Sequence, residues 1–198
     1  MSRSQPNQVT RVGVVGAGVI GGGWAAYFLS RGMDVFAYDP AHEAEARLRA
    51  FIDRAWPALQ QLGLQPGADP ARLRFAPNIE AAVQDVEFVQ ENAPERLDIK
   101  IDTLAQIDAA AQPDIVIGSS TSGYAMTEMQ VKCQHPERTV VAHPFNPPYL
   151  IPLVEVGGGE KTDPALVDWA VAFYNAIGKY GLRMTRELPG FIANRVQE

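Results

Sequence analysis

A glycine-rich turn between an apolar run and a helix-forming segment constrains the fold of this chain most strongly. Val12–Val15 is typical of a buried strand, and it runs directly into a GxGxxG motif formed by Gly16, Gly18 and Gly21. Residues 24–29 then favour a helix. In this order the first glycine allows a tight turn, the second lets the backbone approach a pyrophosphate, and the third lets helix and strand pack closely. The pattern predicts a dinucleotide-binding unit.

An acidic residue at the end of the next predicted strand indicates which dinucleotide is bound. Residues 34–38 (DVFAY) form that strand, and Asp39 follows eighteen residues after Gly21. A carboxylate here accepts hydrogen bonds from the adenosine ribose hydroxyls and repels a 2′-phosphate. No arginine follows Asp39 directly, so we predict NAD rather than NADP as the cofactor. Its phosphates are expected at the helix N-terminus, beside Val19 and Ile20.

Strands and helices alternate along the remaining chain. Further strands are predicted at residues 86–91, 114–118, 140–142, 151–156 and 182–185. Helices are predicted at residues 41–62, 79–83, 95–111 and 163–177, with a loop at residues 63–70. Such alternation is typical of an α/β protein with a Rossmann-type, doubly wound, mainly parallel sheet.

Several polar residues fall just beyond the carboxyl ends of the predicted strands, where ligands bind on such a sheet. They are Asp39, Glu91, Ser122 and His143. Each also has a structural explanation. Ser122 lies in a run of small polar residues that suits an ordinary loop, and Glu91 and Asn92 suit the cap of the following helix. Their convergence on one edge favours a site.

The segment from Thr139 to Val156 (TVVAHPFNPPYLIPLVEV) combines a histidine with an acid on the next apolar run. A return of the chain after the prolines would bring Glu155 beside His143. A carboxylate that holds one ring nitrogen orients the imidazole as a general base. A core histidine followed by an unrelated buried acid is the other interpretation of these residues.

Composition and charge limit the possible partners. A net charge of −6, a pI near 5.1 and scattered basic residues argue against a nucleic-acid surface. The nineteen residues between Arg11 and Arg31 carry no charge, but six of them are glycine, which disfavours a membrane helix or signal peptide. The single cysteine, Cys133, excludes an internal disulfide and suits a reducing compartment. We therefore expect a cytoplasmic protein with a small-molecule substrate, without nucleic-acid or membrane partners and without a metal site.

An ordered set of motifs resembles the 3-hydroxyacyl-CoA dehydrogenase superfamily over essentially the whole chain. The motifs are GAGVIGGG, Asp39, ENAPERLDIK, SSTSG, HPFNP, LVEV and PGFIANR. The resemblance implies NAD-dependent oxidation of a secondary alcohol, in which the base takes the hydroxyl proton and the nicotinamide takes a hydride. It also implies that the cofactor-site acids are Asp39 and Glu91.

The same resemblance assigns roles to residues of the candidate site. The catalytic histidine of the family matches His143, and its paired glutamate matches Glu155. Its substrate-contacting serine and asparagines match Ser122, Asn146 and Asn194, and Asn146 is expected to lie against the cofactor as well.

Within the superfamily, several segments are most similar to the L-carnitine dehydrogenase branch: AWPALQQLGL, RLRF, QENAPERLDIK, GSSTSGY, HPFNPPYLIPLVEV and GGEKT. Carnitine is a 3-hydroxy acid with a trimethylammonium group, which favours aromatic faces. The aromatic candidates are Trp24, Tyr124, Phe145 and Tyr149, for each of which ordinary packing is the competing interpretation. Oxidation of a 3-hydroxyacyl-CoA or of L-gulonate is the alternative activity, and an NAD-binding protein without turnover is the alternative of another class.

The resemblance also implies a domain organisation. Residues 1–188 correspond to the NAD-binding Rossmann domain, and residues 189–198 to the start of an all-helical domain. In the family that domain completes the substrate pocket and forms a homodimer interface. The sequence stops three residues after Arg195, so we expect either a shortened version of a longer protein or a remnant of doubtful activity.

Overall fold

The predicted strand–turn–helix unit forms the start of the fold. In the computed structural model, which describes residues 3–187 and 190–191, β1 (Arg11–Val15) leads into α1 (Val19–Ser30) and then β2 (Asp34–Tyr38). The two strands are parallel, with Val15 opposite Tyr38. A right-handed crossover through a helix is the usual way to join parallel neighbours.

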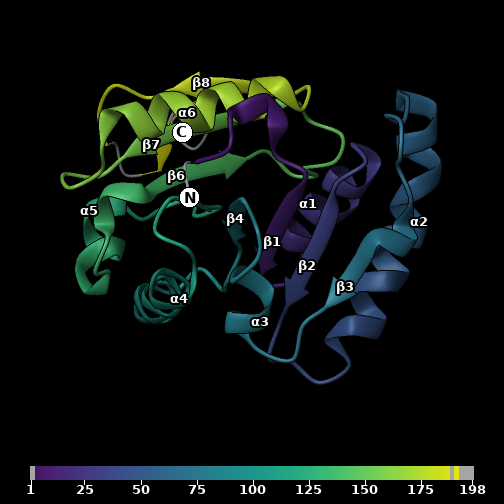
Figure 1. Cartoon of the computed structure of the whole chain (residues 1–198), viewed down its shortest axis with the longest axis horizontal. Coiled ribbons are helices and arrows are strands. Elements are labelled where there is room, and N and C mark those ends of the chain that lie inside the picture. Colours follow the sequence, from purple (N-terminus) through teal and green to yellow (C-terminus); the bar gives the residue numbers. More distant parts are fainter. Residues whose placement is uncertain (1–2, 188–189, 192–198) are drawn as a thin grey trace.

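Eight strands form one sheet in the order β3-β2-β1-β4-β5-β6-β7-β8 (Figure 1). The later strands are β3 (Leu73–Phe75), β4 (Phe88–Glu91), β5 (Val116–Ser119), β6 (Thr139–Pro144), β7 (Leu153–Gly158) and β8 (Tyr180–Arg183). All neighbours pair in parallel except β6 and β7. The predicted fold class, a doubly wound and mainly parallel sheet, is confirmed.

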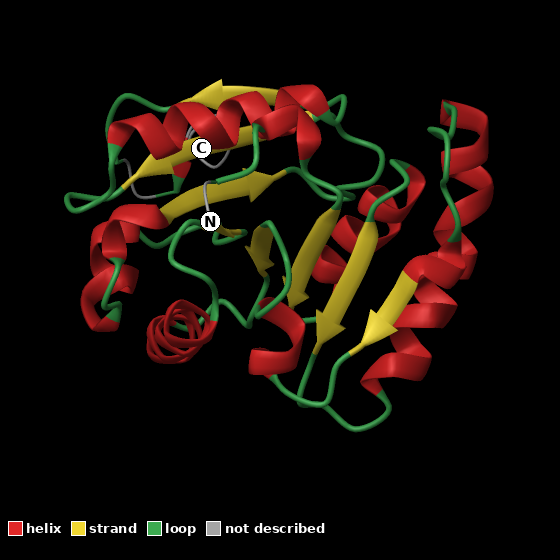
Figure 2. Ribbon diagram, in the orientation of Figure 1, coloured by secondary structure: helices red, strands yellow, loops and turns green. Residues whose placement is uncertain are grey.

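Helices cover both faces of the sheet (Figure 2). The remaining α-helices are α2 (Ala44–Leu62), α3 (Ile79–Val83), α4 (Leu97–Ala110), α5 (Met126–Met129) and α6 (Pro164–Ala176). Short 3-10 turns cover Pro6–Gln8, Pro70–Arg72, Gln130–Lys132 and Pro136–Arg138. One apolar cluster joins α1, α2 and α6 to the sheet, and a second joins α3, α4 and α5 to the other face. Two buried faces explain the continuous apolar runs of the central strands.

Several elements differ from the sequence predictions, among them α5, which was not predicted, and β7, which lies two residues later than predicted. β3 was not predicted, because three residues with a charged centre, Arg74, are too short to show an alternation. α4 begins at Leu97 rather than at residue 95, because the backbone of Arg96 is extended and serves as the N-cap. β8 lies two residues earlier than predicted. None of these changes moves the site.

The sheet topology brings the strand ends together at one edge. Glu91, the last residue of β4, pairs with Val15 of β1 on one side and with Ser119 of β5 on the other. The antiparallel return from β6 to β7 places Glu155 directly opposite His143. Among the described residues, no helix has the length and apolar character needed to cross a membrane. The predicted start of a second domain falls mainly outside the described residues, so that boundary remains a prediction.

Candidate active site

A cavity of about 450 Å³ opens at the carboxyl edge of the sheet. Its lining combines the start of α1, the loop after β4, the loop after β5 and the end of β6. The residues are Gly18, Val19, Ile20, Asn92, Ala93, Pro94, Glu95, Lys100, Ser120, Ser122, His143, Pro144, Phe145 and Asn146. Residues that lie far apart in the sequence therefore share one wall, as the strand order requires.

His143 and Glu155 form the predicted pair. The Nδ1 atom of His143 lies 2.9 Å from Oε2 of Glu155, and the glutamate is 1% exposed. The imidazole also packs against aromatic rings, with Phe145 at 5.8 Å and Phe191 at 5.4 Å between ring centres. In the neutral tautomer that donates Nδ1–H to this carboxylate, the Nε2 atom carries the lone pair. The pair can therefore accept a proton from a ligand in the cavity.

The glycine turn has the space that a pyrophosphate needs. Gly16 has a φ of +91°, which favours glycine, and a Cβ on Gly21 would lie 1.8 Å from the Gly16 carbonyl oxygen. A Cβ on Gly18, by contrast, meets nothing within 4 Å. The open space beside Gly18 continues to Val19 and Ile20, where the first amides of α1 lack partners within the helix. These features fit the phosphates of NAD.

Asp39 organises the same turn from the side of β2. Its Oδ2 atom accepts a hydrogen bond from the Ala17 amide at 2.7 Å, and Oδ1 accepts one from Ala41 at 2.8 Å. The side chain does not line the main cavity but a neighbouring hollow, together with Tyr38, Pro40, Glu45, Phe75, Ala76 and Pro77. This position suits the adenosine end of an extended dinucleotide.

Glu91 is placed differently from the prediction of a cofactor contact. Its carboxylate is fully buried, and both oxygens lie within 3.3 Å of Lys100 Nζ. It also accepts hydrogen bonds from Ser119 and from the Ala93 amide. Glu91 does not cap α4 either, because Arg96 occupies that position. A buried ion pair is favourable only when both charges are compensated, so this carboxylate holds Lys100 rather than a ligand.

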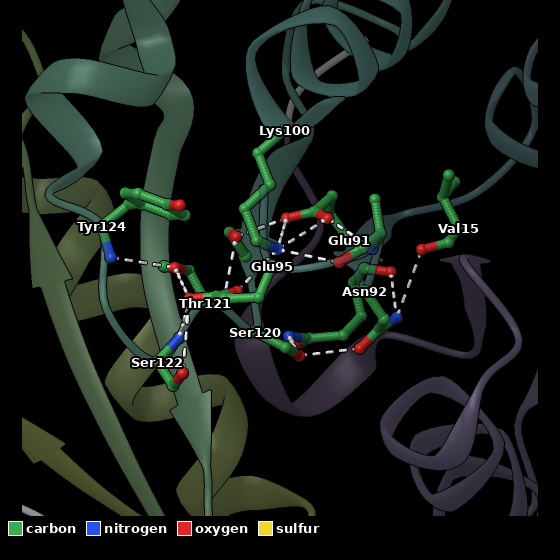
Figure 3. Close-up of polar contacts among 12 residues, drawn as sticks. Val15, Glu91, Asn92, Glu95, Lys100, Ser120, Thr121, Ser122 and Tyr124 are labelled. Atoms are coloured by element: carbon green, nitrogen blue, oxygen red, sulfur yellow. Dashed lines mark hydrogen bonds and ion pairs between the residues drawn. The ribbon is translucent and has the colours of Figure 1, made fainter. Parts of the chain in front are cut away.

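Glu95 links Lys100 to the loop that carries Ser122 (Figure 3). Its Oε1 atom accepts hydrogen bonds from the Thr121 hydroxyl at 2.8 Å and from the Ser122 and Gly123 amides at 2.9 Å each. The Ser122 hydroxyl lies 3.3 Å from the same oxygen. Lys100 Nζ is 3.5 Å from Oε2 of Glu95. The serine loop is therefore fastened to the loop after β4.

The other predicted residues are only partly brought together. Asn146 is exposed and lines the cavity, as does Phe145. Asn194 lies outside the described residues. Trp24 is fully buried in the core, where its Nε1–H donates to Ser120 at 3.2 Å, so it cannot present its face to a ligand. Tyr149 packs against Phe51.

Sequence reasoning missed the importance of Lys100 and Glu95. A signal was available: Lys100 precedes Leu104 by one helical turn and therefore shares the buried face of α4. A lysine on an apolar face requires a partner, and the acid that ends β4 was the nearest candidate. Sequence reasoning also missed Ser120, whose hydroxyl donates to Asn92 Oδ1 at 2.7 Å and accepts from Gln90 at 2.8 Å.

The family model described as "3-hydroxyacyl-CoA dehydrogenase, NAD binding domain" matches residues 11–188. The chain belongs to the 3-hydroxyacyl-CoA dehydrogenase family. This membership confirms the predicted family, an NAD-dependent oxidoreductase family, and NAD as the cofactor. The turn at Gly16–Gly21 and the acid at Asp39 thus belong to an NAD-binding domain.

Relatives of this chain include proteins named L-carnitine dehydrogenase. That of Nocardiopsis dassonvillei is 59% identical over 197 residues, a match that covers 100% of this chain and 60% of the relative. That of Streptomyces griseus is 61% identical over 193 residues, covering 98% of this chain and 58% of the relative. The chain therefore spans about 60% of the length of these relatives.

Solved structures agree with the fold. A 3-hydroxybutyryl-CoA dehydrogenase from Escherichia coli K12 superposes with a TM-score of 0.86 at 31% identity, covering 96% of this chain and 40% of that one. A 5-formyl-3-hydroxy-2-methylpyridine 4-carboxylic acid 5-dehydrogenase, described as an NAD⁺-dependent dismutase, superposes with a TM-score of 0.88 at 35% identity. That match covers 96% of this chain and 62% of the solved one.

Proposed function

We propose that the protein containing this chain oxidises the 3-hydroxyl group of L-carnitine to a ketone, with NAD⁺ as the oxidant and His143 as the general base. The observation that supports this most directly is the His143–Glu155 pair, because His143 lines the same cavity as Gly18 of the glycine turn. The choice of substrate is supported by relatives named L-carnitine dehydrogenase at about 60% identity.

The arrangement of the pair suggests how the proton is moved. The Nε2 atom of His143 accepts the proton of the substrate hydroxyl, while Glu155 keeps the ring oriented and stabilises the imidazolium. NAD, when bound, supplies the acceptor for the hydride that leaves the carbinol carbon. Ser122 and Asn194 are proposed to hold the reacting oxygen, and Asn146 to border substrate and cofactor. Gly18, Val19 and Ile20 would hold the phosphates of the cofactor.

The charges in the cavity favour a small zwitterion over a highly anionic ligand. Among the described lining residues, Lys100 is the only lysine or arginine, and its charge is already compensated by Glu91. Phe145 offers an aromatic surface beside His143, and quaternary ammonium groups bind favourably to such faces. Both observations suit a trimethylammonium substrate.

A substrate panel tests the proposal. The intact protein that contains this chain is incubated with NAD⁺ and L-carnitine, L-gulonate or 3-hydroxybutyryl-CoA, and NADH formation is followed by absorbance. We expect the highest kcat/KM for L-carnitine. A higher value for the coenzyme A thioester would reassign the substrate, and no turnover with any of the three would contradict the proposed dehydrogenase activity.

A further inference from the structure

A network of hydrogen-bonded side chains lies behind the cavity wall, and the proton transfer described above does not use it. We call it the Ser120 network; its members are Trp24, Gln90, Asn92, Ser120 and Tyr174. Trp24, Gln90 and Tyr174 are fully buried, whereas Ser120 and Asn92 also line the cavity. The network therefore connects the core of the sheet with the ligand space.

The hydroxyl group of Ser120, the first residue after β5, is the centre of this network. Its Oγ atom accepts hydrogen bonds from Nε2 of Gln90 at 2.8 Å and from Nε1 of Trp24 at 3.2 Å. Its hydrogen is donated to Oδ1 of Asn92 at 2.7 Å. A hydroxyl group has two lone pairs and one hydrogen, so these three bonds use its whole bonding capacity. Ser120 is therefore suited to hold other groups in place rather than to act on a substrate.

Gln90 extends the network to the strand that carries the histidine. Its Oε1 atom accepts a hydrogen bond from the hydroxyl group of Tyr174 in α6, and its Nε2 atom lies 3.4 Å from the carbonyl oxygen of Ala142. Both polar atoms of the amide are therefore paired. Buried polar groups are tolerated when they are paired, and a fully paired network favours a single arrangement of its members.

The network lies where the backbone pairing of β5 with β6 ends. The last pair in this register is Ser119 with Val141, so Ala142 and His143 extend past β5. Their backbone pairs with β7 on the other side. The amide of Gln90 approaches the same stretch of β6 from the side of β4. It thus supports the backbone next to the histidine at a point that the ladder with β5 no longer reaches.

Asn92 connects the network to the glycine turn (Figure 3). Its backbone amide donates to the carbonyl oxygen of Val15 at 2.7 Å, and its Nδ2 atom lies 3.5 Å from the same oxygen. A Cβ on Gly16 would lie 2.5 Å from the carbonyl oxygen of Asn92, so the turn packs closely against this residue. The hydrogen bond from Ser120 to Asn92 therefore joins the loop after β5 to the turn of the NAD-binding domain.

Hydride transfer depends on the relative position of the two parts that this network joins. In the proposed reaction the alcohol is held beside His143, whereas NAD is held at the glycine turn. Reacting atoms must lie about 3–3.5 Å apart, and a displacement of about 1 Å can lower the rate about 10²-fold. A rigid connection between the histidine strand and the turn is therefore a requirement of the chemistry.

We propose that Ser120 is a positioning residue for hydride transfer. Its hydroxyl group, held by Gln90 and bound to Asn92, keeps the strand before the histidine and the glycine turn in fixed relative positions. This inference rests on the proposed function, because it assumes that His143 holds the reacting alcohol while the turn holds NAD.

The experiment measures the rate constant of the first turnover in the intact protein, by rapid mixing with saturating NAD⁺ and L-carnitine. Slow product release then does not mask the hydride step. For Ser120→Ala we expect this rate constant to fall about 10- to 100-fold. KM for L-carnitine and the dissociation constant for NADH should change by less than about twofold, since the groups that contact the ligands are kept.

Trp24→Phe tests the same hydroxyl group through a different residue. Phenylalanine keeps an aromatic ring against Phe28, which stacks on Trp24 at 5.2 Å between ring centres, but has no N–H to donate. We expect a fall of about three- to tenfold in the first-turnover rate constant. The double variant should be no slower than Ser120→Ala, because Trp24 acts through that hydroxyl group. Losses that multiply in the double variant would overturn the inference.

Ser30→Ala is the matched control. Ser30 is also fully buried, and its hydroxyl group donates to the carbonyl oxygen of Tyr27 at the opposite end of α1 from the turn. It should leave the first-turnover rate constant unchanged even if it lowers the melting temperature. An equal loss in Ser30→Ala, or an unchanged rate in Ser120→Ala, would overturn the inference while the proposed function stands. Absence of L-carnitine turnover in the unmodified protein would instead overturn the proposed function.

A second measurement needs no turnover. The indole N–H resonance of Trp24, assigned by its loss in Trp24→Phe, is recorded by NMR with and without NADH. We expect NADH to shift this resonance in the unmodified protein and to shift it much less in Ser120→Ala, where the connection to Asn92 is removed. No shift in the unmodified protein, or an equal shift in Ser120→Ala, would overturn the inference whatever the substrate.

Discussion

At the scale of single residues, the central feature is the contact between His143 and Glu155. Both side chains are buried, and backbone pairing of β6 with β7 sets them opposite each other. In an antiparallel pair, opposite residues project to the same face of the sheet. The contact therefore depends on strand register as well as on the two residues, and it is oriented before any ligand binds.

Replacing Glu155 by Gln tests the role of that carboxylate. The amide keeps the size of the side chain but removes the charge that stabilises the imidazolium and fixes the ring nitrogen bearing the proton. We expect kcat to fall about 10²- to 10⁴-fold. NADH affinity, measured by fluorescence titration, should stay the same. A kcat within a few fold of the unmodified protein would show that Glu155 is only a core acid.

At the scale of elements, the turn between β1 and α1 joins two functions in one backbone segment. Gly21 permits the close approach of α1 to the turn, whereas Gly18 leaves space in front of it. The first requirement is structural and the second concerns the ligand. Substitution of each glycine by alanine therefore separates folding from cofactor binding.

For Gly18→Ala we expect a melting temperature close to that of the unmodified protein and a clearly weaker affinity for NADH. Its backbone is extended (φ −66°, ψ −161°), which alanine adopts without strain, but the added methyl group occupies the ligand space. Gly21→Ala should instead lose stability by several degrees, because its methyl group meets a backbone oxygen. Thermal denaturation and NADH titration of both variants check this. Equal NADH affinity of Gly18→Ala and the unmodified protein would contradict the assigned phosphate site.

The order of elements and the edge that bears the site could be predicted from sequence because each strand or helix has its own local signal. The GxGxxG turn, the run before His143 and the cap at Asp163 are examples, and the Asp163 side chain does accept the Ala165 amide at 2.9 Å. The partners of Glu95 could not be predicted, since the loop after β4 and the loop after β5 meet only in the folded chain. β3 exists because β2 offers it a free edge, a feature absent from local sequence.

At the scale of the whole molecule, Lys179 joins three segments that lie far apart in the sequence. It precedes β8, its Nζ donates to the carbonyl oxygens of Pro148 and Ile151, and it lies 3.7 Å from the ring centre of Tyr27 in α1. The segment that it holds follows Phe145 and Asn146 of the cavity wall. Burial, aided by the charge of Arg31, lowers the pKa of Lys179 to about 7.

This lowered pKa predicts how the contribution of Lys179 to stability depends on pH. The folded protein releases the proton near pH 7, whereas the unfolded chain keeps it to about pH 10.5, so the contribution rises with pH between these values. Lys179→Met abolishes that rise and leaves two carbonyl oxygens without a hydrogen-bond donor. We expect this loss to lower the free energy of unfolding by about 1–3 kcal/mol. Urea denaturation at about pH 7 and about pH 9 should show a larger stability difference between the two proteins at the higher pH. A difference that shrinks with pH would contradict the prediction.

The proposed reaction requires that His143 acts on the substrate and not on the cofactor. The most direct test is His143→Ala in the intact protein, with L-carnitine oxidation followed by NADH formation and NADH binding measured separately. We predict that oxidation is abolished while the dissociation constant for NADH stays unchanged. An equal loss of NADH affinity, or residual oxidation at the rate of the unmodified protein, would contradict the assignment of His143 as the general base.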